Sequence, residues 1–387
     1  MGKNTKTFKI KDYINYVLVS ALLIFGVVML SMGNLRPSIA QLLAQMGYSI
    51  ILAVSLNLVV GFLGELSLGH AGFMCVGAYV GGKIAVLLSS SLGGTNIVTV
   101  ILALIVGGLC AGICGFIVGL PALRLRGDYL AIVTLAFGEI VKNIIENSKF
   151  FGGQTGLRTP DFTTKRDTRF MLFTIGALVV LLTLFVIQNV IKSKHGRAIT
   201  AIRDNEIAAK ATGINVTKYK LMGFVLSAVF AGLAGVLYSY SVQSIQTVAF
   251  DYNYSIEILV IVVLGGMTVN GSIISAVLIT ALNNILQTKL GGDIAIMKDL
   301  IYALVLIVLV IYRNAPSLKS FREKYNLTNL WRYLIKRKHD PSKHDDDTVR
   351  WDVVPTKISM DEVLSTDVII DNFGDNSADI GERGGNK

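Results

Sequence analysis

Two long stretches without Asp, Glu, Lys or Arg constrain this chain more than any other feature. They cover residues 97–123 and 172–191, and both are mainly apolar. A helix needs about 20 such residues to cross the hydrocarbon core of a bilayer. Only helices and closed barrels satisfy every backbone hydrogen bond there, and unbroken apolar runs without two-residue alternation exclude a barrel. The sequence therefore predicts an all-α polytopic membrane protein.

The composition supports a membrane protein and argues against a soluble or nucleic-acid-binding protein. Only 16% of the 387 residues are charged, whereas a soluble protein carries about 25%. The net charge of +10 would suggest a nucleic acid partner in a soluble protein. Here the basic residues lie mostly between apolar runs, so we interpret them as topology signals and expect no nucleic acid partner. The three cysteines, Cys75, Cys110 and Cys114, lie inside predicted spans and are interpreted as packing residues.

The apolar runs predict about ten transmembrane helices. They lie at residues 13–30, 39–60, 66–88, 97–119, 128–147, 169–191, 219–240, 255–269, 272–290 and 299–313. The excess of Lys and Arg places residues 1–12, 192–220 and the stretch after 313 in the cytoplasm. Both termini are then cytoplasmic, and the loop 148–168 is outside. Residues 13–313 form the predicted transmembrane domain.

Three of these spans have an unusual composition. Segments 61–82 and 255–269 are interrupted by glycines, and 128–147 contains several polar and charged residues. Broken helices at membrane depth are tolerated only where they are buried in protein or line a cavity. Small residues also recur four apart, as in Gly77/Gly81 and Ala228/Gly232, which is the spacing that lets membrane helices approach closely.

The C-terminal part changes character twice. Residues 314–344 form a basic membrane-proximal segment, which suits contact with the lipid headgroups of an anionic leaflet. Residues 345–387 contain eleven acidic residues against four Lys or Arg. With little sustained hydrophobic periodicity, this acidic tail is predicted to be disordered.

The cytoplasmic loop 192–220 predicts two short helices. Asp204 or Asn205 can cap the second helix, and Gly213 can end it. Each helix has a small apolar face surrounded by charges. The residues alone are compatible with docking on a partner protein and equally with a plain connector between two spans.

A family resemblance favours docking. The pattern Glu206-x-Ala208-Ala209-x-x-x-Gly213 resembles the loop by which permeases of ATP-binding cassette (ABC) importers engage their ATPase subunits. Four segments, at residues 58–78, 121–140, 152–156 and 195–234, are similar to the LivM-type permeases of branched-chain amino acid importers. The resemblance covers residues 40–313 in the family's order.

The resemblance carries expectations for residues and partners. The ATPase-coupling residues would be Arg197, Arg203, Asp204, Glu206, Ala208, Ala209 and Gly213. The implied partners are a second, LivH-like permease, two cytoplasmic ATPase subunits and an extracytoplasmic substrate-binding protein. ATP and Mg²⁺ would bind to the ATPases, so this chain would hold no cofactor and catalyse no reaction. Homodimeric pairing remains an alternative, as do other amino acids, urea-like amides or nucleosides as substrates.

Polar residues within the spans are candidates for the translocation pathway, because they are costly in lipid. The candidates are Asn57, Ser67, His70, Glu139, Asn143, Glu257 and Asn283, and Glu65 belongs to the same polar set. Glu139 and Asn143 lie four apart and share a helical face, which makes them the leading pair.

Two other classes of function stay open. An ion- or proton-coupled secondary transporter could use Glu139 and Glu257, and a membrane enzyme could use Ser67 with His70. Residues 77–83 match most of a phosphate-binding loop, but Ile84 stands where Mg²⁺ needs Ser or Thr. No metal-ligand spacing is present, so we expect no metal site.

Overall fold

The computed structural model describes residues 37–91, 96–125, 127–159 and 166–289, together with 303, 304 and 307. Its helices are α2 (Pro37–Asn57), η2 (Leu58–Leu63), α3 (His70–Ser91), α4 (Ile97–Ala122), α5 (Asp128–Asn147), η3 (Lys149–Phe151), η4 (Gly153–Thr155), α6 (Arg166–Lys192), α7 (Lys194–Asp204), α8 (Glu206–Ala211), α9 (Val216–Ser241), η5 (Thr247–Phe250), α10 (Tyr252–Leu264) and α11 (Val269–Lys289). Two short strands, β1 (Leu157–Arg158) and β2 (Ser244–Ile245), complete the described elements.

Six helices of the described part are long and apolar enough to cross a membrane. They are Ile39–Leu63, His70–Ser91, Ile97–Ala122, Phe170–Lys192, Val216–Ser241 and Val269–Leu286. They confirm the predicted all-α polytopic class and correspond to six of the ten predicted spans.

The count of ten is not confirmed. Spans 128–147 and 255–269 correspond to α5 and α10, but α5 carries four charged residues and α10 has only 13 residues. The span 13–30 lies outside the described residues, as does nearly all of 299–313. The N-terminus 1–12, the basic segment 314–344 and the acidic tail 345–387 also lie outside them.

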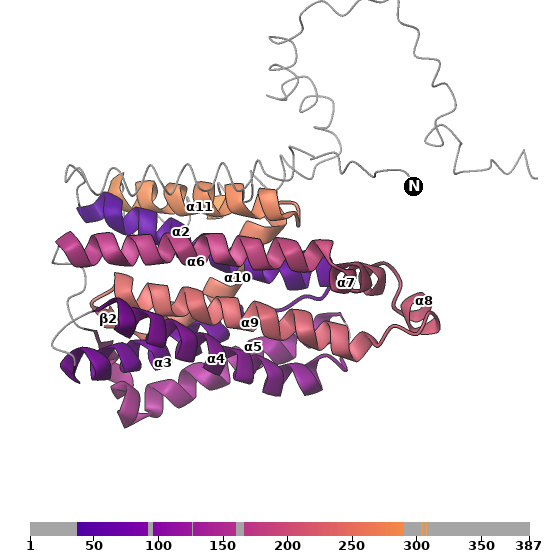
Figure 1. Ribbon diagram of the computed structural model, residues 1–387, viewed down its shortest axis with the longest axis horizontal. Helices are drawn as coiled ribbons and strands as arrows, with labels where there is room; N and C mark the ends of the chain where they lie inside the picture. The colour runs from indigo at the N-terminus through magenta and orange to yellow at the C-terminus, as the bar shows by residue number, and fades with distance from the viewer. Residues whose placement is uncertain are drawn as a thin grey trace, which may run out of the picture. The chain divides into compact units, whose positions relative to one another are not determined.

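The helices run side by side, and the connections separate into two ends (Figure 1). α7 and α8 lie at one end, and β2 lies at the other. β2 pairs antiparallel with β1, with Leu157 opposite Ile245 and Arg158 opposite Ser244. The loop containing β1 is therefore at the end opposite α7 and α8, as the predicted topology requires for loops 148–168 and 192–220.

α9 is the centre of the packing because small residues let α3 and α4 approach it closely. A Cβ added to Gly77 of α3 would lie 2.1 Å from the Gly232 carbonyl oxygen of α9, and one on Gly235 would lie 2.0 Å from the Met74 carbonyl oxygen. No side chain fits at such distances. The predicted small-residue faces are therefore contact surfaces between these helices.

Adding one methyl group at Gly77 should destabilise this contact. We expect Gly77→Ala to lower the melting temperature of the detergent-purified protein, because overpacking a tight contact costs about 1–3 kcal/mol. Gly176→Ala on α6 is the matched control, since its Cβ would lie 3.8 Å from the Leu237 side chain. Equal melting temperatures for the two variants would contradict the close α3–α9 contact.

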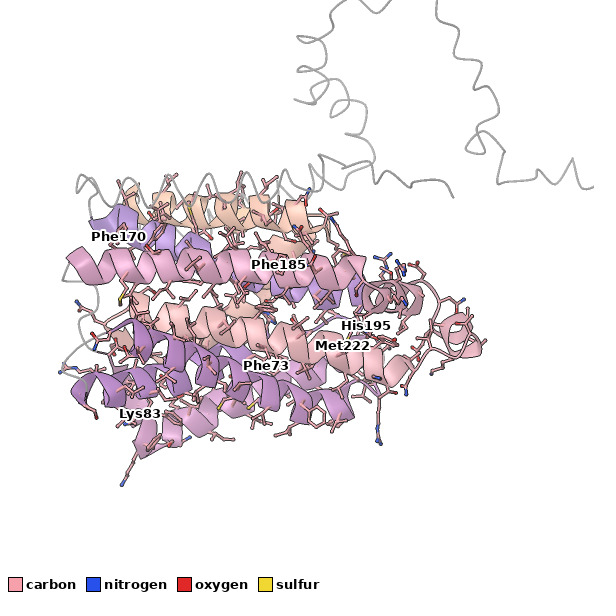
Figure 2. All side chains as sticks on the ribbon, in the orientation of Figure 1. Phe73, Lys83, Phe170, Phe185, His195 and Met222 are labelled. Atoms are coloured by element: carbon pink, nitrogen blue, oxygen red, sulfur yellow. The ribbon has the colours of Figure 1, made fainter. Side chains whose placement is uncertain are left out.

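Large apolar side chains remain exposed around the bundle. Phe170 and Phe185 on α6 are labelled in Figure 2, and Phe185 is 58% exposed. On α4, Ile113 and Ile117 are 58% and 61% exposed. Such a surface is unfavourable in water but suits lipid or a second membrane subunit.

Two interruptions break the membrane helices at the predicted glycines. η2 is a π-helix, and the chain then leaves helical conformation from Gly64, whose φ is +77°, until α3 begins at His70. α10 ends at Leu264, and a turn containing Gly266 precedes α11. The span 128–147, noted for its polar and charged residues, is the continuous helix α5.

The two interruptions lie against each other. In the amide orientation that satisfies both neighbours, the fully buried Asn57 donates to the Met267 carbonyl oxygen at 3.1 Å and accepts from the Val269 N–H at 3.3 Å. Asn57 ends α2 beside the first break, while Met267 and Val269 form the second. One buried side chain thus connects two breaks that are 200 residues apart in sequence.

Candidate functional site

The sequence between α6 and α9 folds locally into two capped helices. The Ser193 hydroxyl accepts hydrogen bonds from the N–H groups of His195 and Gly196, so α7 begins there. The Asn205 side chain accepts from the N–H groups of Ile207 and Ala208 at 3.0 Å each, which caps α8. The predicted pair of short helices with a cap at Asn205 is confirmed. We call residues 194–213 the α7–α8 element.

Gly213 ends this element as expected. Its φ is +83°, in the left-handed region that glycine adopts without strain. Its N–H donates to the Lys210 carbonyl oxygen at 3.0 Å. A side chain at this position would strain the turn that returns the chain to α9.

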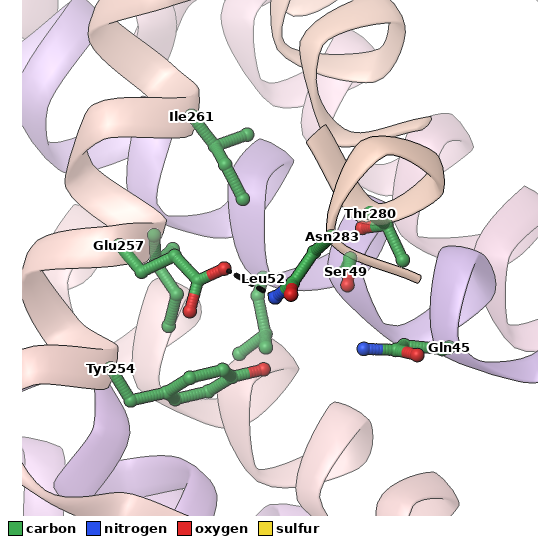
Figure 3. Close-up of a pocket in the computed structure, with 9 residues that line it drawn as sticks. Gln45, Ser49, Leu52, Tyr254, Glu257, Ile261, Thr280 and Asn283 are labelled. Carbon is green, nitrogen blue, oxygen red and sulfur yellow. Dashed lines mark hydrogen bonds between the residues drawn. The ribbon is translucent and has the colours of Figure 1, made fainter. Parts of the chain in front are cut away.

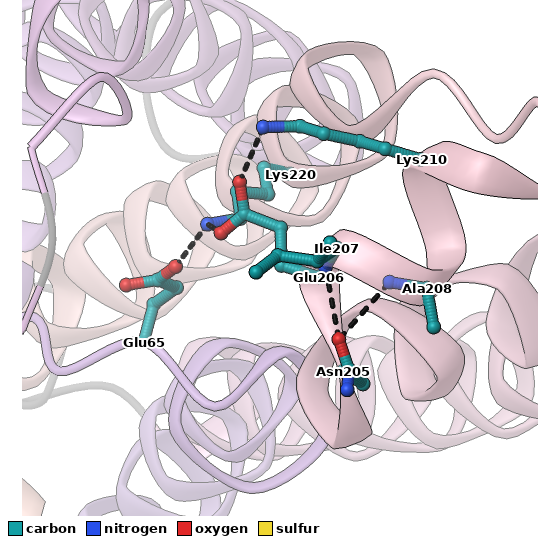
Figure 4. A network of polar contacts seen from close by, with 7 residues as sticks. All are labelled: Glu65, Asn205, Glu206, Ile207, Ala208, Lys210 and Lys220. Atoms are coloured by element: carbon teal, nitrogen blue, oxygen red, sulfur yellow. Dashed lines mark hydrogen bonds and ion pairs between the residues drawn. The ribbon is translucent and has the colours of Figure 1, made fainter.

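A network of charged residues joins the α7–α8 element to the first helix break (Figure 4). Lys220, at the start of α9, is only 4% exposed and forms an ion pair with Glu65, which lies in the break. The same ammonium group contacts Glu206 of α8 at 3.2 Å. Lys220 therefore binds two carboxylates, one from the first helix break and one from α8.

Glu206 has a second partner on its own helix. Its Oε1 accepts a hydrogen bond from Lys210 Nζ at 2.8 Å. This bond, followed by the contact with Lys220, lowers the pKa of Glu206 to about 2 despite partial burial. Glu206 is therefore ionised at neutral pH.

Arg203 makes a second connection between the element and the break. Its Nη1 donates to the Gly61 carbonyl oxygen of η2 at 2.8 Å, while its Nε and Nη2 bind Asp204 Oδ1 at 3.2 and 3.0 Å. A Cβ on Gly64 would lie 2.5 Å from Arg203 Cγ. The arginine thus lies directly against the start of the interruption.

The apolar residues of the element divide between inside and outside. Ala209 packs with Ile202 and Val216 in a small core of its own. Ile207 is 76% exposed, and Ala208 is also exposed. α8 is therefore held on the bundle by one side and presents a small apolar surface with its other side.

The expected coupling residues differ in their surroundings. Arg203 and Glu206 face the bundle through the contacts above, and Ala209 is buried. Arg197 and Asp204 are exposed on α7. The residues are thus gathered in one element, partly as its attachment and partly as its outer surface.

Two of the expected pathway residues meet at a cavity (Figure 3). Glu257 on α10 and Asn283 on α11 approach to 3.5 Å between Oε1 and Nδ2. The cavity has a volume of about 80 Å³ and lies between α2, α10 and α11.

The remaining pathway candidates lie elsewhere. Asn57 connects the two breaks, and Glu139 accepts hydrogen bonds from Lys142 and from the Tyr252 N–H at 3.0 Å. Asn143, four residues later on α5, is exposed in the single chain.

Ser67 and His70 do not form a catalytic pair in the described structure. His70 is buried, and its Nε2 lies 2.9 Å from the Ser55 hydroxyl. The buried Ser67 hydroxyl has no hydrogen-bond partner among the described residues. His70 is engaged in helix packing, which removes the geometric basis for using it as the base of Ser67.

Sequence reasoning did not select Lys220 as a functional residue. Lys220 lies at the edge of an apolar run, where a basic residue is ordinarily a topology signal. Glu65 belonged to the intramembrane polar set, without a partner. The signal that could have joined them is that opposite charges stand at the ends of two predicted spans that the predicted topology places on the same side of the membrane.

Comparison with known proteins gives one consistent result. Residues 38–310 match the model of the family described as branched-chain amino acid transport system / permease component. The chain is 35% identical over 308 residues to the high-affinity branched-chain amino acid transport system permease protein LivM of Escherichia coli K12, covering 72% of this chain and 70% of the relative. It is also 35% identical over 306 residues to the protein of the same name from Salmonella typhimurium, covering 72% and 69%.

A more distant relative is named as a permease for a sugar. The chain is 27% identical over 306 residues to the ribose import permease protein RbsC of Haemophilus influenzae, covering 73% of this chain and 87% of the relative. The region that matches the family model, residues 38–310, contains the six described helices that are long and apolar enough to cross a membrane.

Proposed function

The chain belongs to the family of branched-chain amino acid transport permeases and is of the LivM type, and from this premise we propose its part in transport. It is the membrane-spanning permease subunit of an ATP-driven importer in a bacterial inner membrane. It forms part of the pathway for branched-chain amino acids that an external binding protein delivers. The substrate class is supported by the names of the two relatives at 35% identity, against 27% for the ribose permease.

The proposal assigns the energy-consuming step to partner chains. A second, LivH-like permease completes the membrane part, and two cytoplasmic ATPase subunits bind ATP and Mg²⁺. Residues 192–220 dock on the ATPase, with Ile207 and Ala208 as the outer contact surface. Both termini lie on the same, cytoplasmic side, with the basic segment 314–344 near lipid and the acidic tail 345–387 in solution.

The attachment of α8 to a helix break is the observation that carries this proposal. α8 has only six residues. Without contacts to the membrane helices, it could bind an ATPase but could not transmit movement. Lys220 joins its Glu206 to Glu65, and Arg203 joins α7 to Gly61. A displacement of the element would therefore move the interruption in the membrane with it. Such rigid coupling is a common way of passing motion between sites.

The second break would follow the first. Asn57 holds the backbone at Met267 and Val269, so α10 and α11 cannot keep their positions when η2 shifts. α10 and α11 also line the cavity that contains Glu257 and Asn283. ATP-driven motion at the cytoplasmic end would reach the candidate pathway through this chain of contacts.

Reconstitution with the partner subunits tests the proposal. We expect uptake of leucine into proteoliposomes to require ATP hydrolysis and to persist when ion gradients are collapsed. A non-hydrolysable ATP analogue is the matched control. Uptake that continues with the analogue and stops with the gradients would replace the proposal by the secondary-transport alternative.

A further inference from the structure

We infer that the cavity between α2, α10 and α11 binds the ammonium group of the amino acid in transit, with the Glu257 carboxylate as its counter-ion. The inference rests on the proposed import of amino acids and adds the site that recognises one end of the substrate. Six polar residues line the cavity, namely Gln45, Ser49, Tyr254, Glu257, Thr280 and Asn283.

The placement of these residues is regular. Each of the three helices contributes two of them, separated by three or four positions in the sequence. Residues at this spacing lie on one face of a helix, one turn apart. Three helices thus direct paired polar residues at one point (Figure 3). Polar residues are costly inside a membrane unless they pair with one another or face a cavity or pathway. Their convergence from three helices therefore indicates a binding site.

The chemistry of the lining matches an ammonium group. An ammonium group has three N–H donors and no acceptor. The lining offers a carboxylate at Glu257, hydroxyl oxygens at Ser49 and Thr280, and amide oxygens at Gln45 and Asn283. A charge-assisted bond to the carboxylate would be the strongest of these contacts.

Glu257 meets Asn283 at the cavity. Glu257 Oε1 accepts a hydrogen bond from Asn283 Nδ2 at 3.5 Å, at the outer limit for a hydrogen bond. A donor with full positive charge would approach more closely. Asn283 would then keep the carboxylate oriented toward the cavity.

The size and the apolar wall indicate which part of the substrate fits. About 80 Å³ is far below the ~300–1,000 Å³ of pockets that enclose a whole small ligand. The cavity therefore suits a head group. Leu52, Ile258 and Ile261 complete its wall with aliphatic surface, which suits the carbon chain next to an ammonium group better than the water shell of an inorganic cation.

Chemical labelling tests the inference directly. Dicyclohexylcarbodiimide modifies carboxyl groups in apolar surroundings, and mass spectrometry of the assembled importer would quantify the label on Glu257. We expect leucine and protonated isopentylamine to reduce labelling, and 4-methylpentanoate, which lacks the ammonium group, to leave it unchanged. Protection by Na⁺ or K⁺ but not by isopentylamine would show an inorganic cation site and overturn the inference. Equal labelling with every probe would also overturn it.

Transport by substituted proteins gives an independent test. We expect Glu257→Gln to lower leucine uptake at least about tenfold, the size of effect of losing one charge-assisted hydrogen bond, and Glu257→Asp to recover part of it. Glu146→Gln is the matched control, because Glu146 is a partly buried acid of α5 that binds Thr247 and does not line the cavity. Uptake by Glu257→Gln within twofold of the control would overturn the inference whatever the labelling result.

The outcome separates this inference from the proposed function. If Glu257→Gln transports normally while uptake still requires ATP hydrolysis, the ammonium site is wrong and the importer assignment stands. If uptake is independent of ATP in the unaltered protein, the proposed function itself fails.

Discussion

Replacing Lys220 by methionine is expected to abolish ATP-driven uptake. Methionine has a similar length but no charge, so Glu65 and Glu206 would lose the ammonium group between them. Glu65 is 9% exposed, and leaving a buried charge without its partner costs about 3–5 kcal/mol. α8 would lose its link to the helix break, although Arg203 still joins α7 to Gly61, and part of the protein would fail to fold.

Lys218→Met is the matched control for this prediction. Lys218 lies two residues earlier on α9 and is exposed. Its backbone N–H donates to the Asn215 side chain, and the substitution keeps this bond. We expect uptake within about twofold of the unaltered protein, because exposed charges contribute about 0–1 kcal/mol. Equal loss of uptake in both variants would show that the positive charge of this region, and not the buried network, is what matters.

A double substitution separates stability from coupling. Glu65→Gln with Lys220→Met removes the charge from both members of the buried pair, so the amount of folded protein in the membrane should return toward the original level. Uptake should remain low, and ATP hydrolysis per molecule transported should rise, because α8 has lost its attachment to the break. Recovery of uptake together with protein amount would mean that the pair only stabilises the fold.

Reversing the charge of Glu206 is expected to have the second-largest effect. Glu206→Lys would place three ammonium groups where Lys210 and Lys220 now share one carboxylate. It would also put a positive charge in the first turn of α8, where the helix dipole favours a negative one. We expect uptake to fall by at least about tenfold, which corresponds to ~1.4 kcal/mol, and recovery of the ATPase subunits with the purified permease to fall as well.

Two variants calibrate this result. Glu206→Gln keeps an oxygen acceptor at the same position and should lie between the original protein and Glu206→Lys. Lys194→Glu reverses a charge on the exposed start of α7 and should transport normally. Normal transport by Glu206→Lys would contradict the assignment of α8 to ATPase docking.

The sequence by itself determined the class of the protein, the main membrane helices and the short helices outside them. The reason is that these features depend on local patterns. Apolar length predicted α4 and α6, and cap residues predicted the α7–α8 element with its end at Gly213. Glycines also located the two breaks in the membrane helices.

Only the tertiary structure decided which polar residues work together. Glu65 and Lys220 are 155 residues apart, and Asn57 and Met267 are 210 apart. Spacing along one helix states which residues share a face, but not which neighbour that face meets. In a membrane bundle that choice depends on how closely the backbones approach, and here small residues such as Gly77, Gly232 and Gly235 set the approach.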